Sequence, residues 1–78
     1  MRPAHPTDDE IRAALLSLAA ARAPKTFCPS EVARALAEDW RPLMPRIREL
    51  ARDAGLTATQ RGAPVDAVTA RGPIRLSL

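Results

Sequence analysis

The chain has 78 residues, of which 46% are hydrophobic, and a formal net charge of +3. A chain of this length has room for one domain of modest stability, because it buries only about 60% of the surface that its unfolded form exposes. The single cysteine excludes an internal disulfide, and no apolar run approaches a membrane span in length. The opening MRPAHPTDDE lacks the apolar stretch of a signal peptide, so we expect a reduced, cytoplasmic protein without membrane contact.

The positive charge lies in the second half of the chain. Residues 1–39 carry five basic and six acidic groups, a net of −1, whereas residues 40–78 carry seven basic and three acidic groups, a net of +4. Eleven of the twelve basic residues are arginines, whose forked guanidinium suits bidentate phosphate contacts. A chain rich in arginine and alanine is also what a GC-rich genome encodes for any protein. The position of the charge is therefore stronger evidence about binding than the preference for arginine over lysine. It makes residues 40–78 the candidate half for contact with a partner.

The first predicted element is a helix over residues 8–22, preceded by residues 1–6, which hold two prolines and are expected to be a disordered lead. Thr7 and Glu10 have the spacing of a capping box, and the acidic first turn suits the helix dipole. Pro24 ends the helix because it disfavours helical backbone in the residue before it. The apolar face of this helix consists of Ile11, Ala14, Leu15, Leu18 and Ala19.

A short extended link, residues 25–27, leads to a second predicted helix over residues 29–38. The link is too short for a full strand but can pair with the edge of a hairpin. Pro29 suits the first helical position and Glu31 the third position of a capping box, which makes Cys28 the cap residue. The side chains expected to be buried from this helix are Val32, Ala33, Ala35 and Leu36.

The stretch WRPLMPRIRELARDAG, residues 40–55, predicts a third helix with two different faces. Pro42 and Pro45 predict a 3₁₀-like start, which is followed by regular helix over residues 43–54 and a left-handed cap at Gly55. At about 100° per residue, one apolar face holds Leu43, Ile47, Leu50, Ala51 and Ala54. A flank that faces away from it holds Arg41, Arg48 and Arg52. A helix with a buried face and an arginine-lined flank is typical of a domain that meets polyanions, with nucleic acid the leading candidate.

Two strands are predicted after the third helix. Leu56 and Ala58 alternate with threonines, and at the C-terminus the alternating apolar residues are Ile74, Leu76 and Leu78, so we expect a hairpin whose apolar face lies on the helices. The connection RGAPVDAVTARGP, residues 61–73, is long for a hairpin, and Asp66 is placed to cap a single helical turn within it. The predicted fold is therefore mainly α with a small β-hairpin, an α+β arrangement around a three-helix core.

The order helix, short strand, helix, helix, strand, loop, strand resembles the winged-helix group of the helix-turn-helix superfamily. The segments CPSEVARAL, DWRPLMPRIRELA, GLTATQRG, PVD and ARGPIRLSL are also similar to a family of small bacterial proteins of unknown function. That resemblance covers residues 15–78, implies a winged-helix-like fold and brings no activity or cofactor with it. We expect a single winged-helix-like domain over residues 7–78. In winged-helix DNA binders the third helix enters the major groove and the loop between the strands contacts the backbone or minor groove.

Carried over to this chain, the resemblance makes five arginines the candidate nucleic-acid-binding residues. The third helix supplies Arg41, Arg48 and Arg52, and the loop supplies Arg61 and Arg71. Four of them have a plainer alternative: Arg48 and Arg52 can pair with Glu49 and Asp53 on a solvated face, and the loop arginines can pair with Asp66. The helix also starts with Trp, Pro, Leu, Met and Pro, where base-reading side chains normally stand, so the sequence does not favour sequence-specific readout.

The remaining chemistry-bearing residues indicate no enzyme. Cys28 has no second cysteine or neighbouring histidine to support a redox or nucleophilic role, and the only histidine, His5, lies in the lead. Trp40 between two short helices is more often the wedge that fixes their angle than a base-stacking residue, and we expect the wedge. No spacing of ligands or catalytic groups predicts a metal site, a cofactor site or a catalytic centre. The expected partner is double-stranded DNA, and the alternative is another protein docked on the same fold; no feature predicts an oligomeric state.

Overall fold

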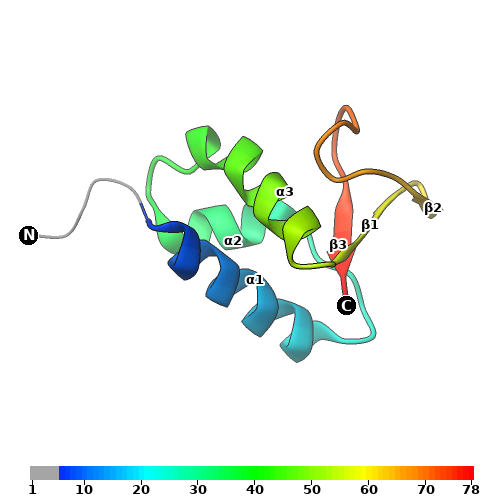
Figure 1. Ribbon diagram of the computed structural model, residues 1–78, viewed down its shortest axis with the longest axis horizontal. Coiled ribbons are helices and arrows are strands. Elements are labelled where there is room, and N and C mark those ends of the chain that lie inside the picture. The colour runs from blue at the N-terminus through cyan, green and yellow to red at the C-terminus, as the bar shows by residue number, and fades with distance from the viewer. Residues whose placement is uncertain (1–5) are drawn as a thin grey trace, which may run out of the picture.

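The computed structural model describes residues 6–78 and, within them, contains three α-helices and a small antiparallel sheet (Figure 1). The sheet lies at one end of the helices, beside the C-terminal ends of α1 and α3. The predicted α+β class is therefore confirmed, whereas residues 1–5 of the lead that was predicted over residues 1–6 lie outside the described residues. The elements in chain order are α1 Asp8–Arg22, α2 Pro29–Leu36, the 3₁₀ helix η1 Arg41–Leu43, α3 Met44–Asp53, β1 Thr57–Gln60, β2 Ala63–Pro64 and β3 Arg75–Ser77.

Helix α1 has the predicted bounds because its N-terminus is capped as expected. The Thr7 hydroxyl accepts a hydrogen bond from the Glu10 backbone N–H at 3.2 Å, and the Glu10 carboxylate accepts one from the Thr7 N–H at 3.2 Å. Of the predicted apolar face, Ala14 and Leu18 are half-buried. The fully buried members are Ile11, Leu15 and Ala19.

Helix α2 is two residues shorter than predicted and buries a narrower face. It ends at Leu36 because Ala37 takes an extended backbone with φ −153°, although the Ala37 N–H still donates to the carbonyl of Ala33. The predicted burial of Ala35 is wrong: this residue is exposed, because it lies on the side of the helix that points away from the core. Val32 and Ala33 are buried as expected, and Leu36 is half-buried.

The third helix begins as a 3₁₀ turn, as its two prolines predict. Pro42 lies in η1, and Pro45 lies in the first turn of α3, where a missing N–H leaves no intrahelical bond unmade. Gly55 follows the helix with φ +78°, the left-handed conformation expected of a glycine cap. The residues that α3 and η1 bury are Leu43, Ile47, Leu50 and Ala51.

The sheet has three strands in the order β2-β1-β3, not the two strands that the sequence predicted. β1 pairs with β3 in antiparallel register, with Ala58 opposite Leu76. The link before α2 pairs with the free edge of β3, as expected, because Phe27 and Leu76 exchange two backbone hydrogen bonds of 2.8 Å. Leu78 was predicted to face the core but is 64% exposed, because it lies beyond the last paired residue of β3.

The core lies between the helices and the inner face of the sheet. Its largest fully buried side chains are Phe27, Ile11, Leu15, Ile47, Leu50, Ile74 and Leu76. They come from α1, α3, the link and the C-terminal strand region, so the sheet is held on the helices by apolar contact. None of the helices among residues 6–78 is both long and apolar enough to cross a bilayer.

Candidate nucleic-acid interface

The connection between β1 and β3, residues 61–73, is called the wing here. It begins with a tight turn at Arg61 and Gly62, whose φ angles are +52° and +81°. Two successive positive φ values are typical of the type I′ turn, which matches the twist of the two strands that it joins. The turn brings β2 back along β1, with Gln60 opposite Ala63, so β2 is a third strand that the sequence did not predict.

A single helical turn follows in the wing, and Asp66 caps it as predicted. The Asp66 carboxylate accepts hydrogen bonds from the backbone N–H groups of Val68 and Thr69 at 2.7 and 3.1 Å. These two bonds, led by the one from Val68, hold the pKa of Asp66 below its usual range. Ala67, in the same turn, is only 2% exposed, so the middle of the wing is anchored in the core.

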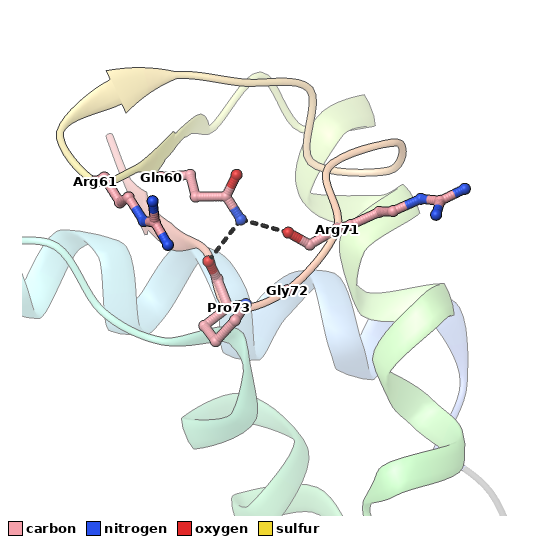
Figure 2. Close-up of a pocket in the computed structure, with 5 residues that line it drawn as sticks. All are labelled: Gln60, Arg61, Arg71, Gly72 and Pro73. Atoms are coloured by element: carbon pink, nitrogen blue, oxygen red, sulfur yellow. Dashed lines mark hydrogen bonds between the residues drawn. The ribbon is translucent and has the colours of Figure 1, made fainter.

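The last part of the wing is held by two side chains from different elements. Arg48 on α3 donates from Nη1 to the carbonyl oxygen of Ala70 and from Nη2 to that of Gly72, both at 2.7 Å. Gln60 on β1 donates from Nε2 to the carbonyl oxygens of Arg71 and Pro73 (Figure 2). Four consecutive carbonyls are thus bound alternately from the helix and from the strand. This double clamp fixes the wing against α3.

The helix arginines differ in how they meet the wing. Arg48 is half-buried, and its guanidinium is engaged with carbonyl oxygens. Arg52 is exposed, and its guanidinium lies 3.6 Å from the carboxylate of Asp66. Asp66 was expected as a possible partner of the wing arginines, but it pairs with this helix arginine. Glu49, one of the two expected partners of the helix arginines, instead lies 3.3 Å from the guanidinium of Arg46. Arg48 and Arg52, the two arginines of the predicted flank that lie in α3, therefore both face the wing.

Arg41, Arg61 and Arg71 are exposed, and no carboxylate of residues 6–78 lies within 4 Å of their guanidiniums. Arg41 lies with its guanidinium 4.7 Å from the centroid of the Trp40 ring. Arg61 and Arg71 line an open hollow of about 590 Å³ together with Gln60, Gly72 and Pro73. Their side chains extend to different sides of the wing and do not converge on one point (Figure 2). The wing therefore presents two separate cations and no preformed pocket for one small anion.

Two residues central to this arrangement were not singled out from the sequence, namely Gln60 and Arg34. Nothing in the sequence around Gln60 predicts that its side-chain amide donates hydrogen bonds to carbonyls of the wing. Arg34 on α2 lies 4.7 Å from the Trp40 ring centroid, like Arg41. The spacing between Arg34 and Trp40 does not predict this contact, because Arg34 lies in α2 while Trp40 lies beyond the end of that helix, directly before η1.

The described part of the chain contains no group of three or more His, Cys, Asp and Glu side chains placed to hold a metal ion. The thiol of Cys28 is half-buried and lies 3.1 Å from the hydroxyl oxygen of Ser30. The Cys28 backbone N–H donates to the Glu31 carboxylate at 3.1 Å, as the capping-box spacing predicts. Cys28 is thus part of the start of α2.

These features define an α+β protein in which three helices carry a small antiparallel sheet with a clamped wing. The family model DUF3253, described as a protein of unknown function, matches residues 8–78, and the chain belongs to this family. The similarity to a family of unknown function expected from the sequence is thereby confirmed. None of the curated proteins matches the chain.

Proposed function

We propose that this protein is a winged-helix-like module that binds the backbone of double-stranded DNA through the wing and the adjoining end of α3. The arrangement of the sheet supports the comparison with winged helices. Phe27, from the link between the first two helices, pairs with β3, and β3 pairs with β1, which directly follows the third helix. In winged-helix proteins the third helix enters the major groove while the wing contacts the phosphate backbone or the minor groove.

The observation that carries the proposal is the double clamp on the wing. Arg48 and Gln60 bind four consecutive wing carbonyls, so the wing and α3 form one continuous surface before any partner arrives. Preorganisation of this kind favours binding, because less conformational freedom is lost in the complex. Arg61 and Arg71 project from this surface without a carboxylate within 4 Å among residues 6–78.

The clamp also divides the candidate arginines into two groups. Arg48 positions the wing, since its donors already bind carbonyl oxygens, and Arg52 shares its charge with Asp66. Phosphate contacts are therefore assigned first to Arg41, Arg61 and Arg71. The start of α3 offers apolar side chains and prolines in place of base readers, so binding is expected to depend on charge and shape more than on sequence.

The salt dependence of binding to a random-sequence duplex tests this proposal. If arginines neutralise phosphates, log K should fall with log salt by about 0.9 for each contact. Removing Arg61 and Arg71 together by alanine should flatten this slope by about two units. Both side chains are exposed and neither donates a hydrogen bond within residues 6–78, so folding should be unchanged, which thermal melting can verify.

A matched control removes the same charge from a different place. Lys25 in the link is exposed, and Arg12 on α1 is half-exposed and pairs with Asp9 at 3.1 Å. Both are far from the wing in sequence, and replacing both by alanine also lowers the net charge by two. An equal loss of affinity in both double variants would mean that the protein is merely a weak polycation. Negligible duplex binding by the parent protein at physiological salt would overturn the proposal and favour the alternative role in protein docking.

A further inference from the structure

Two arginines lie over the ring of Trp40 at the start of the third helix. The guanidinium carbons of Arg34 on α2 and Arg41 in η1 each lie 4.7 Å from the centroid of the indole ring. Trp40 is half-buried and packs against the core, so it is a fixed platform for two otherwise long and flexible side chains. Planar cations over an aromatic face are attracted by its quadrupole. The three residues are called the Arg–Trp–Arg stack below.

A guanidinium that lies over an aromatic ring can still donate hydrogen bonds from its N–H groups to another ligand. Within residues 6–78, the N–H groups of Arg34 and Arg41 donate to no protein acceptor, and no carboxylate lies within 4 Å of either. Forked donors on the edge of a guanidinium match two phosphate oxygens at once. The two guanidiniums repel each other because both are positively charged and lie near the same ring. An anion bound between them would reduce this repulsion.

Two acidic residues stand close by in sequence and could have neutralised the stack. Glu38 and Asp39 lie between Arg34 and Trp40 in the chain, and both are exposed. Glu38 is four residues after Arg34, the spacing of a helical ion pair, but α2 ends at Leu36 and no such pair forms. Among residues 6–78, Glu38 and Asp39 therefore form no ion pair with either guanidinium, and both guanidiniums lie over the ring of Trp40.

We propose that the Arg–Trp–Arg stack is a second phosphate-binding site, which holds the phosphodiester backbone of the duplex at the N-terminal end of α3. This inference rests on the proposed DNA-binding function and adds a contact point away from the wing. Arg41 precedes Arg48 by seven residues, so the stack lies roughly 10 Å along the helix from the residue that braces the wing. The stack and the wing then contact different phosphates.

Trp40 itself provides the measurement, because the chain has one tryptophan and no tyrosine. Its emission should be quenched more strongly by iodide than by caesium in the free protein, because the two guanidiniums attract the anion and repel the cation. A saturating amount of random-sequence duplex should suppress the quenching by iodide. Equal quenching by the two ions in the free protein would show that no anion site surrounds Trp40 and would overturn the inference.

The affinity for a labelled duplex is then compared among three double variants by fluorescence anisotropy. Replacement of Arg34 and Arg41 by alanine should flatten the salt slope by about two units, as for Arg61 and Arg71, while the control that changes Arg12 and Lys25 should not. If only the wing variant lost its slope, the stack would not be a phosphate site and Arg41 would lose its assignment to phosphate contact, while DNA binding through the wing would stand. If the parent bound an acidic peptide and no duplex, both proposals would fall.

Lysine at both stack positions provides a second check on the mode of contact. Arg34→Lys with Arg41→Lys keeps the charge but replaces the planar fork by a point charge. The salt slope should stay close to that of the parent, because the number of neutralised phosphates is unchanged, while the affinity should fall. An affinity equal to the parent's would mean that charge alone is recognised and that the fork geometry argued above is wrong.

Discussion

The guanidinium of Arg48 meets the carbonyl oxygen of Ala70 at 2.7 Å, across 22 residues of sequence. Its second nitrogen binds the carbonyl of Gly72, and Gln60 binds the two carbonyls that alternate with these. A loop with so few regular backbone pairs would otherwise leave its carbonyls to water and move freely. The orientation of the wing relative to α3 is therefore decided by two polar side chains.

Arg48→Ala should loosen the wing more than it destabilises the fold. Hydrogen bonds from a charged donor contribute roughly 1.5 to 3 kcal/mol each when partly shielded, and half-burial of Arg48 favours the lower end. We expect a moderate loss of stability in urea unfolding, together with faster hydrogen exchange and faster proteolysis within residues 61–73. Arg71→Ala is the matched control, because the bond that Arg71 makes to Gln60 uses its backbone carbonyl. Equal proteolysis of the two variants would show that Arg48 does not hold the wing.

Leu15→Ala should lower the free energy of unfolding by about 2 to 5 kcal/mol, because it leaves a cavity in the centre of the core. Leu15 is 0% exposed, whereas the next residue, Leu16, is 40% exposed on the same helix. Leu16→Ala therefore applies the same chemical change and the same change in helix propensity without the cavity. Urea unfolding of both variants gives the comparison. A similar loss at the two positions would contradict the register of α1.

The position of α1 could be predicted from the sequence because its signals are local. The capping box at Thr7 and Glu10 fixes the start of the helix, and every group in it lies within four residues of the others. The same is true of the proline-rich start of the third helix and of Gly55 at its end. Local signals of this kind act before any tertiary contact forms, so they are readable without knowing the partner elements.

The wing could not be predicted to the same extent, for two physical reasons. Its first turn uses Arg61 at a left-handed position, where asparagine, aspartate or glycine would have signalled a tight hairpin, so β2 was missed. The helical period placed Arg48 correctly on the flank opposite the apolar face, but the period carries no information about what covers that flank. The partners of Arg48 are backbone carbonyls, which every residue has and no sequence pattern marks.

Acid should destabilise the protein through carboxylates that are paired in the folded state. The pKa of Asp8 is lowered chiefly by its hydrogen bond from Arg46, and that of Glu31 chiefly by the bond from the Cys28 backbone N–H and then by Arg22. A carboxyl whose folded pKa lies below its unfolded value contributes stability at neutral pH, and this contribution is lost as the pH falls through the folded pKa. We therefore expect melting temperatures to fall below about pH 4.

Asp8 allows this acid effect to be assigned to one ion pair. Arg46 donates from Nε to Asp8 at 3.0 Å and thereby joins α3 to the first turn of α1. Asp8→Asn and Arg46→Ala should each weaken the dependence of the melting temperature on acid, because either change removes the pairing that lowers the pKa of Asp8. The two changes together should have no larger effect on the pH dependence than either alone. Additive effects would mean that the two residues titrate independently.

Cys28→Ser should be tolerated and slightly stabilising, by no more than about 1 kcal/mol, because a hydroxyl is a better helix cap than a thiol. Cys28 precedes α2, and the bond from its backbone N–H to Glu31 does not depend on the side chain. Cys28→Ala is the control, since it removes the thiol without adding a capping hydroxyl and should bring no gain. A loss of duplex binding in the serine variant, with folding intact, would show that the thiol has a role beyond the start of the helix.

Arg61→Asn should raise stability and lower duplex affinity at the same time. Arg61 has a φ of +52°, a conformation that costs most residues about 1 kcal/mol but that asparagine tolerates, especially before a glycine in a type I′ turn. The substitution relieves this strain and removes one of the two wing cations that we assign to phosphate contact. Arg71→Asn removes the other cation, and Arg71 does not have a positive φ, so that variant should lose affinity without gaining stability. Urea unfolding and the salt slope of duplex binding measure the two effects separately. If Arg61→Asn gained stability and kept its full affinity for the duplex, the strain at Arg61 would be unrelated to binding, and the assignment of Arg61 to the contact surface would be withdrawn.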